Sequence, residues 1–369
     1  MKSARSVNFY DTIQTWVRTR RPDTPFTGAT PAAFRRWQRA FAPHYRRMLG
    51  PWPRRAAPRV KVLERVKLDG YVREKIIYDS TPGMSVPCYL LVPTGLRKGE
   101  KRPGLLAAHG HGKGKADICG VMTGKPGKNY ADWAASFTAS PRHPDTDHAS
   151  WVRSLNYDYA AQAARLGYVV IAPDWIPFGE RRPPQWFVRD GRDECDISSM
   201  AMQYFGHTLI AQNVWDGMRA VDLLALHPNV DARRLGVIGL SYGGTMSTHL
   251  LINDSRLKAG VVSGYVSTVR VDALNGRGKG NTCGAQYVPG LLAHGDIPEM
   301  LGLAAPKPVL FEMGRRETCF HYPDMLVAYK KVERMYRAAG HPERIAHDTF
   351  DADHMWSGRR AWSWLAMWL

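Results

Sequence analysis

The chain has 369 residues, 44% of them hydrophobic and 23% charged, which is typical of a folded globular protein and excludes a disordered one. Lys and Arg outnumber Asp and Glu by 51 to 33, giving a formal net charge of +18. The N-terminal sequence lacks the apolar stretch of a signal peptide, and no segment is long enough to cross a bilayer. We therefore expect a cytoplasmic protein without a membrane partner.

Basic residues concentrate near the N-terminus, at 18–21 and 46–59, where they are interleaved with Trp and Pro. They do not gather on one DNA-reading helix, so no nucleic-acid partner is predicted. Residues 1–59 are interpreted as an Arg-, Trp- and Pro-rich extension packed on a catalytic domain of residues 60–369. Such an extension could serve as a subunit contact, which leaves a homo-oligomer open.

The five cysteines are scattered and form no C-x-x-C pair, which argues against a zinc ribbon or a redox motif. They are Cys88, Cys119, Cys195, Cys283 and Cys319. We interpret them as reduced thiols. No metal and no cofactor is predicted.

In chain order, three strand-like runs at 60–68, 71–78 and 86–92 are joined by turn sequences and predict an antiparallel meander. Strands then alternate with helices. The predicted strands are 104–109, 168–172, 235–238, 259–262, 308–313 and 344–350, and the predicted helices are 157–165, 214–226, 242–252, 325–339 and one from 359. This order predicts an α/β fold: a mostly parallel twisted sheet with helices on both faces and antiparallel strands at its N-terminal edge.

Two long stretches, 113–156 and 264–305, interrupt this alternation and are predicted to be loop insertions that wall a pocket. A short helical pattern is also visible at 32–41.

The sharpest motif is Gly-Leu-Ser-Tyr-Gly-Gly at 239–244, which follows a predicted strand and precedes a predicted helix. This is the context in which G-x-S-x-G forms a nucleophile elbow, a strained turn that projects the serine hydroxyl out of the sheet. The motif predicts that Ser241 is a nucleophile.

A serine nucleophile of this kind needs an acid and a histidine, in the chain order Ser, acid, His. His354 follows the last predicted strand and is the candidate base. Glu317, four residues beyond the strand 308–313, is the candidate acid, although it could also be a surface partner of a neighbouring arginine. Asp324 is its rival, but it directly precedes a helix, where aspartate is a common N-cap.

Backbone N–H groups must stabilise the oxyanion of such a reaction. The first candidate is the N–H of Tyr242, directly after the nucleophile. The second is the N–H of His111, within the His-Gly-His-Gly sequence that follows the strand 104–109. Trp175 and Tyr265 are weaker candidates for the substrate pocket.

Five segments together resemble the dienelactone hydrolase and acetyl xylan esterase-like branch of the α/β-hydrolases. They are the sequences at 109–112, 172–181, 239–244, 261–265 and 351–354. The resemblance implies ester or lactone hydrolysis by a triad that includes Ser241 and His354, with no metal. The chain departs from these relatives at Glu317, where they have Asp, and at Ser241, where dienelactone hydrolases proper have Cys.

Two other polar segments are predicted to be non-catalytic. The string His-Pro-Asp-Thr-Asp-His at 143–148 resembles a dinuclear zinc motif but lacks its third-position His, so a polar loop is favoured. Asp174 and Glu180 are expected in a structural loop, with Glu180 paired to Arg181 or Arg182.

The sequence thus predicts a carboxylic ester hydrolase that acts through an acyl-enzyme on a small-molecule or carbohydrate ester. A peptidase of the prolyl-oligopeptidase type and a non-catalytic binding protein of the same fold remain alternatives. The prefix is too short for the propeller that such peptidases carry.

Overall fold

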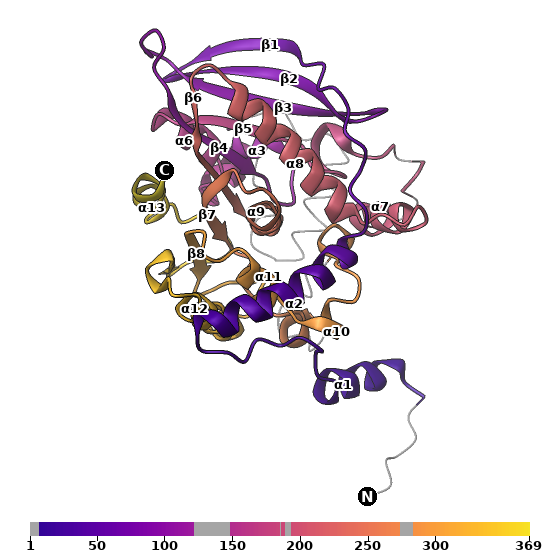
Figure 1. The fold of residues 1–369 in the computed structure, drawn as a ribbon. Coiled ribbons are helices and arrows are strands. Elements are labelled where there is room, and N and C mark those ends of the chain that lie inside the picture. Colours follow the sequence, from indigo (N-terminus) through magenta and orange to yellow (C-terminus); the bar gives the residue numbers. More distant parts are fainter. Residues whose placement is uncertain (1–6, 122–147, 185, 189–192, 274–282) are drawn as a thin grey trace, which may run out of the picture.

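One sheet organises the molecule in the computed structural model, which describes residues 7–121, 148–184, 186–188, 193–273 and 283–369. Within these residues the sheet has nine strands in the order β1-β2-β3-β5-β4-β6-β7-β8-β9 (Figure 1). The strands are β1 Lys61–Leu68, β2 Tyr71–Thr81, β3 Met84–Pro93, β4 Arg102–Ala108, β5 Val169–Pro173, β6 Val230–Leu240, β7 Leu257–Ser263, β8 Val309–Gly314 and β9 Ile345–Phe350.

The strand directions confirm the predicted fold class. Strands β1, β2 and β3 pair antiparallel, and β3 also pairs antiparallel with β5. From β5 through β4 to β9 every pairing is parallel. The parallel strands therefore bring their carboxyl ends to one edge of the sheet, where ligands bind in α/β folds.

Helices cover both faces of the sheet because the strand side chains are apolar on both sides. Leu106 and Ile171 pack in one hydrophobic cluster with α8 (Leu209–Leu226), α9 (Tyr242–Asn253) and α12 (Tyr322–Ala339). Their chain neighbours Leu105 and Val170 pack in a second cluster, with α6 (Tyr159–Arg165) and α13 (Ala361–Trp368). The predicted helices on both faces are thereby confirmed.

The chain before β1 forms two helices, α1 (Phe9–Thr19) and α2 (Pro31–Leu49), so the helical pattern seen at 32–41 extends further than predicted. Helix α2 begins with Thr30 as N-cap and buries aromatic side chains that include Phe34, Trp37 and Phe41. These side chains join the cluster that contains α12. Figure 1 shows α2 running across α12 and its neighbours.

Smaller helices occupy the long interruptions, which are therefore not structureless where they are described. They are α3 (Lys115–Ile118), α5 (His148–Ser154), α10 (Leu291–His294) and α11 (Ile297–Leu303). A further helix, α7 (Glu194–Gln203), lies between β5 and α8. Single turns occur at η1 (Gly179–Arg181), η2 (Val269–Ala273), η3 (Gly284–Gln286) and η4 (Pro342–Arg344). Among the described helices, none combines the length and the apolarity that crossing a membrane requires.

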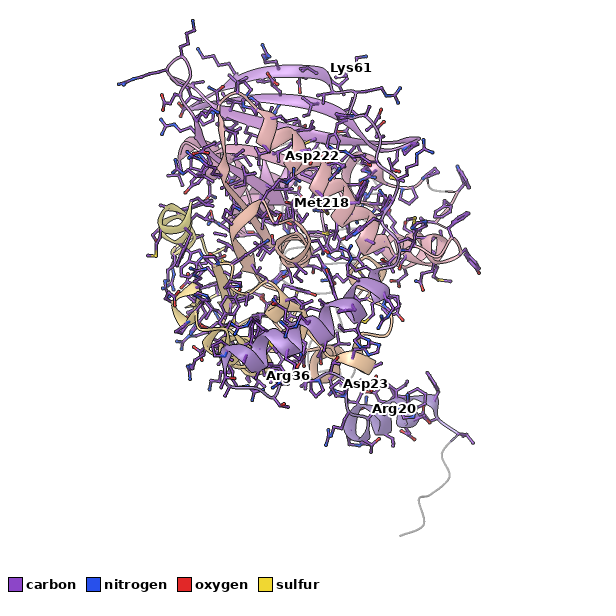
Figure 2. All side chains as sticks on the ribbon, in the orientation of Figure 1. Arg20, Asp23, Arg36, Lys61, Met218 and Asp222 are labelled. Carbon is purple, nitrogen blue, oxygen red and sulfur yellow. The ribbon has the colours of Figure 1, made fainter. Side chains whose placement is uncertain are left out.

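Part of the excess of arginine is used in ion pairs on α8. Figure 2 marks Met218 and Asp222 on this helix. The Asp222 carboxylate lies between 2.6 and 3.1 Å from nitrogens of three arginines, Arg55, Arg219 and Arg256. Arg256 also donates a hydrogen bond to the carbonyl of Met218. These contacts tie the segment before β1 and the turn before β7 to the same helix.

The loop after β5 is held by a buried ion pair. Lys115 Nζ lies 2.6 Å from Asp174 Oδ2 and 2.5 Å from Glu180 Oε1, and Asp174 is fully buried. The loop is thus built as a structural element around Asp174. The expected partners of Glu180 were wrong, because Arg181 pairs with Asp216 and Arg182 with Glu194.

Replacing Lys115 by Met should destabilise the protein by about 3–5 kcal/mol, because it leaves the buried Asp174 carboxylate without its cation. The exposed Arg65 beside Glu74 offers a matched control, for which Arg65→Met should cost about 0–1 kcal/mol. Urea unfolding measures both free energies. Equal losses in the two variants would contradict this account of the loop.

Candidate active site

Ser241 lies on the turn between β6 and α9 with φ 62° and ψ −123°, in the left-handed region that non-glycine residues rarely adopt. Its backbone N–H donates to the carbonyl of Ser263 at 3.0 Å, which ties the turn to the end of β7. Glycine is required beside it, because a Cβ on Gly243 would overlap the carbonyl oxygen of Ala108. This is the geometry of the nucleophile elbow that the motif predicted.

His354 and Glu317 are brought together by the loops after β9 and β8. His354 Nδ1 lies 3.0 Å from Glu317 Oε2 and 2.9 Å from Oε1, and the Glu317 side chain is only 1% exposed. The carboxylate also accepts the backbone N–H of Cys319 at 2.8 Å. Asp324 instead pairs with His321 at 2.8 Å. It lies in the first turn of α12, and the N-cap is His321 rather than Asp324.

One carboxylate oxygen of Asp353 joins the loop after β8 to the loop after β9. Asp353 Oδ1 accepts the backbone N–H of Thr318 at 2.9 Å, its hydroxyl at 2.7 Å and the backbone N–H of His354 at 2.7 Å. Because these donors come from the loops that carry the acid and the histidine, Asp353 sets their spacing. No separate role was predicted for Asp353 from the sequence.

The imidazole of His354 packs against Gly264, which follows β7. A Cβ on Gly264 would lie 2.8 Å from His354 Cε1 and 3.0 Å from Leu240 Cδ1. Gly264 is the neighbour of Ser263, whose carbonyl accepts the N–H of Ser241. Ser241 and His354 therefore both lie beside the end of β7, at the carboxyl edge of the sheet. His354 Nε2 is buried and has no hydrogen-bond partner among the described residues.

Two neighbours favour the protonated form of His354. Burial by itself lowers the pKa of the imidazole, but the negative charges of the Cys319 thiolate and the Glu317 carboxylate outweigh it and raise the pKa well above 6.5. The sequence offered no sign of Cys319 at this place. The pair therefore stabilises an imidazolium, which is the form a general base reaches after it takes a proton.

The loop 109–112 is locked by the ring of His109. Its Nδ1 donates to the carbonyl of Gly110 at 2.7 Å, and its Nε2 accepts the backbone N–H of Trp175 at 3.0 Å. Desolvation lowers the pKa of His109 to about 4, so the ring is neutral at pH values above this. A neutral ring with one donor and one acceptor matches both contacts.

The same loop lies directly against the elbow. A Cβ on Gly110 would approach Ser241 Cβ to 3.1 Å, and the Gly110 N–H donates to Tyr157 Oη at 2.8 Å. The rings of His111 and Tyr242 are 5.6 Å apart between centroids. The structure thus brings together the two segments whose N–H groups were predicted to bind an oxyanion.

An apolar cavity of about 270 Å³ adjoins this site. Its lining includes Tyr265, Leu291, Met300 and Phe320, and the Phe320 ring also packs beside His354 with centroids 6.3 Å apart. The expected walling of a pocket by the segment 264–305 is confirmed in its described part. Trp175, in contrast, is fully buried in the core and is not among the residues that line this cavity.

Among the predicted non-catalytic segments, residues 143–147 of the string at 143–148 lie outside the described residues. Its last residue, His148, has Nε2 at 2.6 Å from the buried Asp117.

Sequence reasoning missed the role of Glu312 in β8. Its side chain is fully buried and accepts the N–H groups of Gly358 at 2.9 Å and Ser357 at 3.1 Å, which anchors the segment after His354. Desolvation raises the pKa of Glu312 to about 7. A charged residue inside the apolar run 309–313 was the available signal, because buried carboxylates are rare without a specific role.

Comparisons with known proteins agree with this fold. The sequence model of a family described as the Abhydrolase family matches residues 2–361. YtaP of Bacillus subtilis (strain 168), which carries a provisional hydrolase name, is 27% identical over 274 residues, covering 73% of this chain and 77% of YtaP.

Two solved structures show the same fold. BF1801 of Bacteroides fragilis NCTC 9343, provisionally assigned as an acetyl xylan esterase, matches with a TM-score of 0.73 and 18% identity, over 95% of this chain and 84% of that one. A glucuronoyl esterase from Solibacter usitatus matches with a TM-score of 0.63 and 15% identity, over 92% and 93% of the two chains.

Replacing Glu312 by Gln should flatten part of the dependence of stability on pH. The folded protein keeps the Glu312 proton up to about pH 7, whereas the unfolded chain loses it near 4.5. The contribution of protonated Glu312 to the free energy of unfolding is therefore complete below pH 4.5, and it is lost as the pH rises to about 7. Over that window the wild type should lose on the order of 3 kcal/mol more than the Gln variant.

Urea unfolding at several pH values gives the two slopes. Glu333→Gln, at a partly exposed position of α12, is the matched control and should follow the wild-type slope. Parallel curves for wild type and Glu312→Gln would contradict the assignment of this proton to Glu312.

Proposed function

The chain belongs to the Abhydrolase family, and on that premise we propose that it is a serine-dependent carboxylic ester hydrolase. The observation that carries the proposal is the His354–Glu317 hydrogen bond, formed at the sheet edge where Ser241 occupies its strained turn. A nucleophile beside a histidine that an acid orients is the arrangement of acyl-transfer enzymes. In this proposal Ser241 is the nucleophile, His354 the base and Glu317 the acid that orients it.

In the proposed reaction, Ser241 Oγ attacks the ester carbonyl carbon while His354 Nε2 takes its proton. The carbonyl π electrons move to the oxygen, which becomes an oxyanion. Collapse of this intermediate breaks the bond to the alcohol, which leaves with the proton from His354. Water then attacks the acyl-enzyme by the same route, with His354 again as base, and releases the acid.

Glu317 acts on His354 electrostatically in the proposed reaction. Its carboxylate accepts the Nδ1 proton, which leaves Nε2 as the basic atom, and it stabilises the imidazolium formed after proton transfer. The oxyanion would be bound by the N–H groups of Tyr242 and His111. Removing one such donor typically costs about 10²–10³ in rate.

The apolar cavity supports an ester with a small apolar group on one side of the bond, which would pack against Tyr265 and Phe320. The names of the similar structures, an acetyl xylan esterase and a glucuronoyl esterase, are those of carbohydrate esterases. We therefore propose a small-molecule or carbohydrate ester as the substrate class.

Replacing Glu317 by Gln should lower kcat by on the order of 10³–10⁴, because the amide cannot stabilise the imidazolium or fix its tautomer. Asp324→Asn should retain wild-type kcat, since Asp324 pairs with His321 and not with His354. Steady-state kinetics on a p-nitrophenyl ester measures both. A large loss in Asp324→Asn with little change in Glu317→Gln would reverse the assignment of the acid.

Ser241→Ala should abolish the hydrolysis of p-nitrophenyl acetate and butyrate and prevent labelling by a fluorophosphonate, because it removes the only atom proposed to form the acyl-enzyme. Ser255→Ala, at an exposed position, is the matched control and should behave as wild type. Cleavage of peptide p-nitroanilides in preference to the esters would favour a peptidase. Full activity of Ser241→Ala would remove the basis of the proposal.

A further inference from the structure

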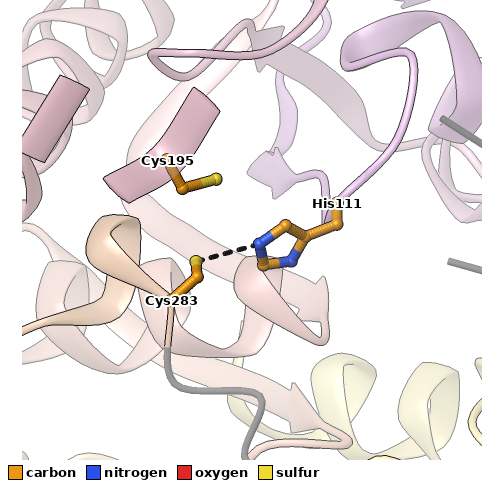
Figure 3. Close-up of side chains that lie close together, drawn as sticks. All are labelled: His111, Cys195 and Cys283. Atoms are coloured by element: carbon orange, nitrogen blue, oxygen red, sulfur yellow. Dashed lines mark hydrogen bonds between the residues drawn. The ribbon is translucent and has the colours of Figure 1, made fainter. Parts of the chain in front are cut away.

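Three metal-ligating side chains, none of them Ser241, His354 or Glu317, converge at the loop 109–112. His111 lies on that loop, Cys195 in the first turn of α7, and Cys283 directly before η3. Figure 3 shows the three side chains pointing toward one another. His111 Nε2 is 3.1 Å from Cys283 Sγ, and the three donor atoms all lie within 4.8 Å of one another.

The backbone fixes this convergence. Gly284 N–H donates to Asp196 Oδ1 at 2.7 Å, and a Cβ on Gly284 would lie 2.6 Å from the carbonyl oxygen of Cys195. The chain segments that carry the two cysteines are therefore in direct contact. The His111 ring packs against the rings of Phe178 and Tyr242, with centroids 5.0 and 5.6 Å away. The donors are thus held in place by packed segments rather than by exposed flexible chains.

The donor set selects the kind of ion. Two thiolates and one imidazole are ligands of Zn²⁺ and other soft or borderline ions, whereas Mg²⁺ and Ca²⁺ require oxygen ligands. Tetrahedral zinc, with bonds of about 2.3 Å to sulfur and about 2.0 Å to nitrogen, places its donors about 3.5–3.8 Å apart. The separation of His111 Nε2 from Cys283 Sγ is 3.1 Å and every donor separation is at most 4.8 Å, which is compatible with this range after small side-chain movements.

Charge balance favours the same ion. Cys195 is buried, so an uncompensated charge at this place would be costly. Two thiolates and a neutral imidazole around Zn²⁺ have no net charge. Three protein ligands also leave one tetrahedral position for water, as in other zinc sites with two cysteines and one histidine.

We propose that His111 Nε2, Cys195 Sγ and Cys283 Sγ form a zinc-binding site. On binding, each thiol releases its proton to solvent and its sulfur donates an electron pair to the ion, with no change of oxidation state. The ion links the loop 109–112 to α7 and η3. The site shares no side chain with Ser241, His354 or Glu317, so it does not depend on the proposed hydrolase activity.

The test uses the full chain, reduced and freed of metal with a chelator. Titration with Zn²⁺ against a chromogenic chelator should show one equivalent bound. Co²⁺ in place of zinc should give the visible bands of a tetrahedral site and a near-ultraviolet band from thiolate-to-cobalt charge transfer. Cys195→Ser and Cys283→Ser should each weaken zinc binding about 100-fold or more and abolish or reduce the charge-transfer band, because each removes a thiolate ligand.

Cys319→Ala is the matched control, because Cys319 belongs to the second group of metal-ligating side chains, with Glu317 and His354. It should bind zinc as the wild type does. Circular dichroism of the metal-free variants verifies that they are folded. Loss of zinc binding in Cys319→Ala, but not in Cys195→Ser or Cys283→Ser, would move the ion to the other group and overturn the proposal.

Two further results would also overturn it. One is a reduced, folded wild type that takes up neither Zn²⁺ nor Co²⁺. The other is a Cys195–Cys283 disulfide, detected by mass spectrometry of unreduced peptides, together with no metal uptake after its reduction. All five cysteines lie among the described residues and none is in a disulfide.

Discussion

The site depends on close contact between backbones at the carboxyl edge of the sheet. Ser241 adopts a left-handed conformation that costs about 1–3 kcal/mol, and its surroundings must make this conformation the only one that fits. The hydrogen bond from its N–H to Ser263 and the approach of Gly243 to Ala108 provide that restraint. Strands β4, β6 and β7 therefore meet at a point where a side chain larger than hydrogen has no room.

Polar side chains extend this restraint to the other loops. Asp353 joins the loops that carry Glu317 and His354, and Glu312 anchors the chain that follows. On the opposite side, the neutral ring of His109 ties the loop 109–112 to the end of β5. Polar side chains that need not touch a substrate thus position the loops that carry the acid, the histidine and the predicted oxyanion donors. Such supporting residues restrict the motion of the reacting side chains and hold them in the orientation that the reaction needs.

Much of the fold could be predicted because the parallel strands are apolar runs bounded by glycine, and because α8, α9 and α12 follow a helical pattern. The elbow at Ser241 could be predicted for the same local reason. The choice between Glu317 and Asp324 could not, because both follow β8 and only the path of the loop decides which one reaches His354. The partners of Glu180 and the burial of Trp175 depend on contacts distant in sequence, and so does the meeting of His111 with Cys195 and Cys283.

The packing of α2 affects how the chain can fold during synthesis. This helix is made early in synthesis, yet its aromatic face is buried against α10, α11 and α12, which belong to the last third of the chain. On the ribosome, Phe34, Trp37 and Phe41 must remain exposed until that last third has emerged. Contacts so distant in sequence slow folding and lengthen the time for which this apolar surface is exposed.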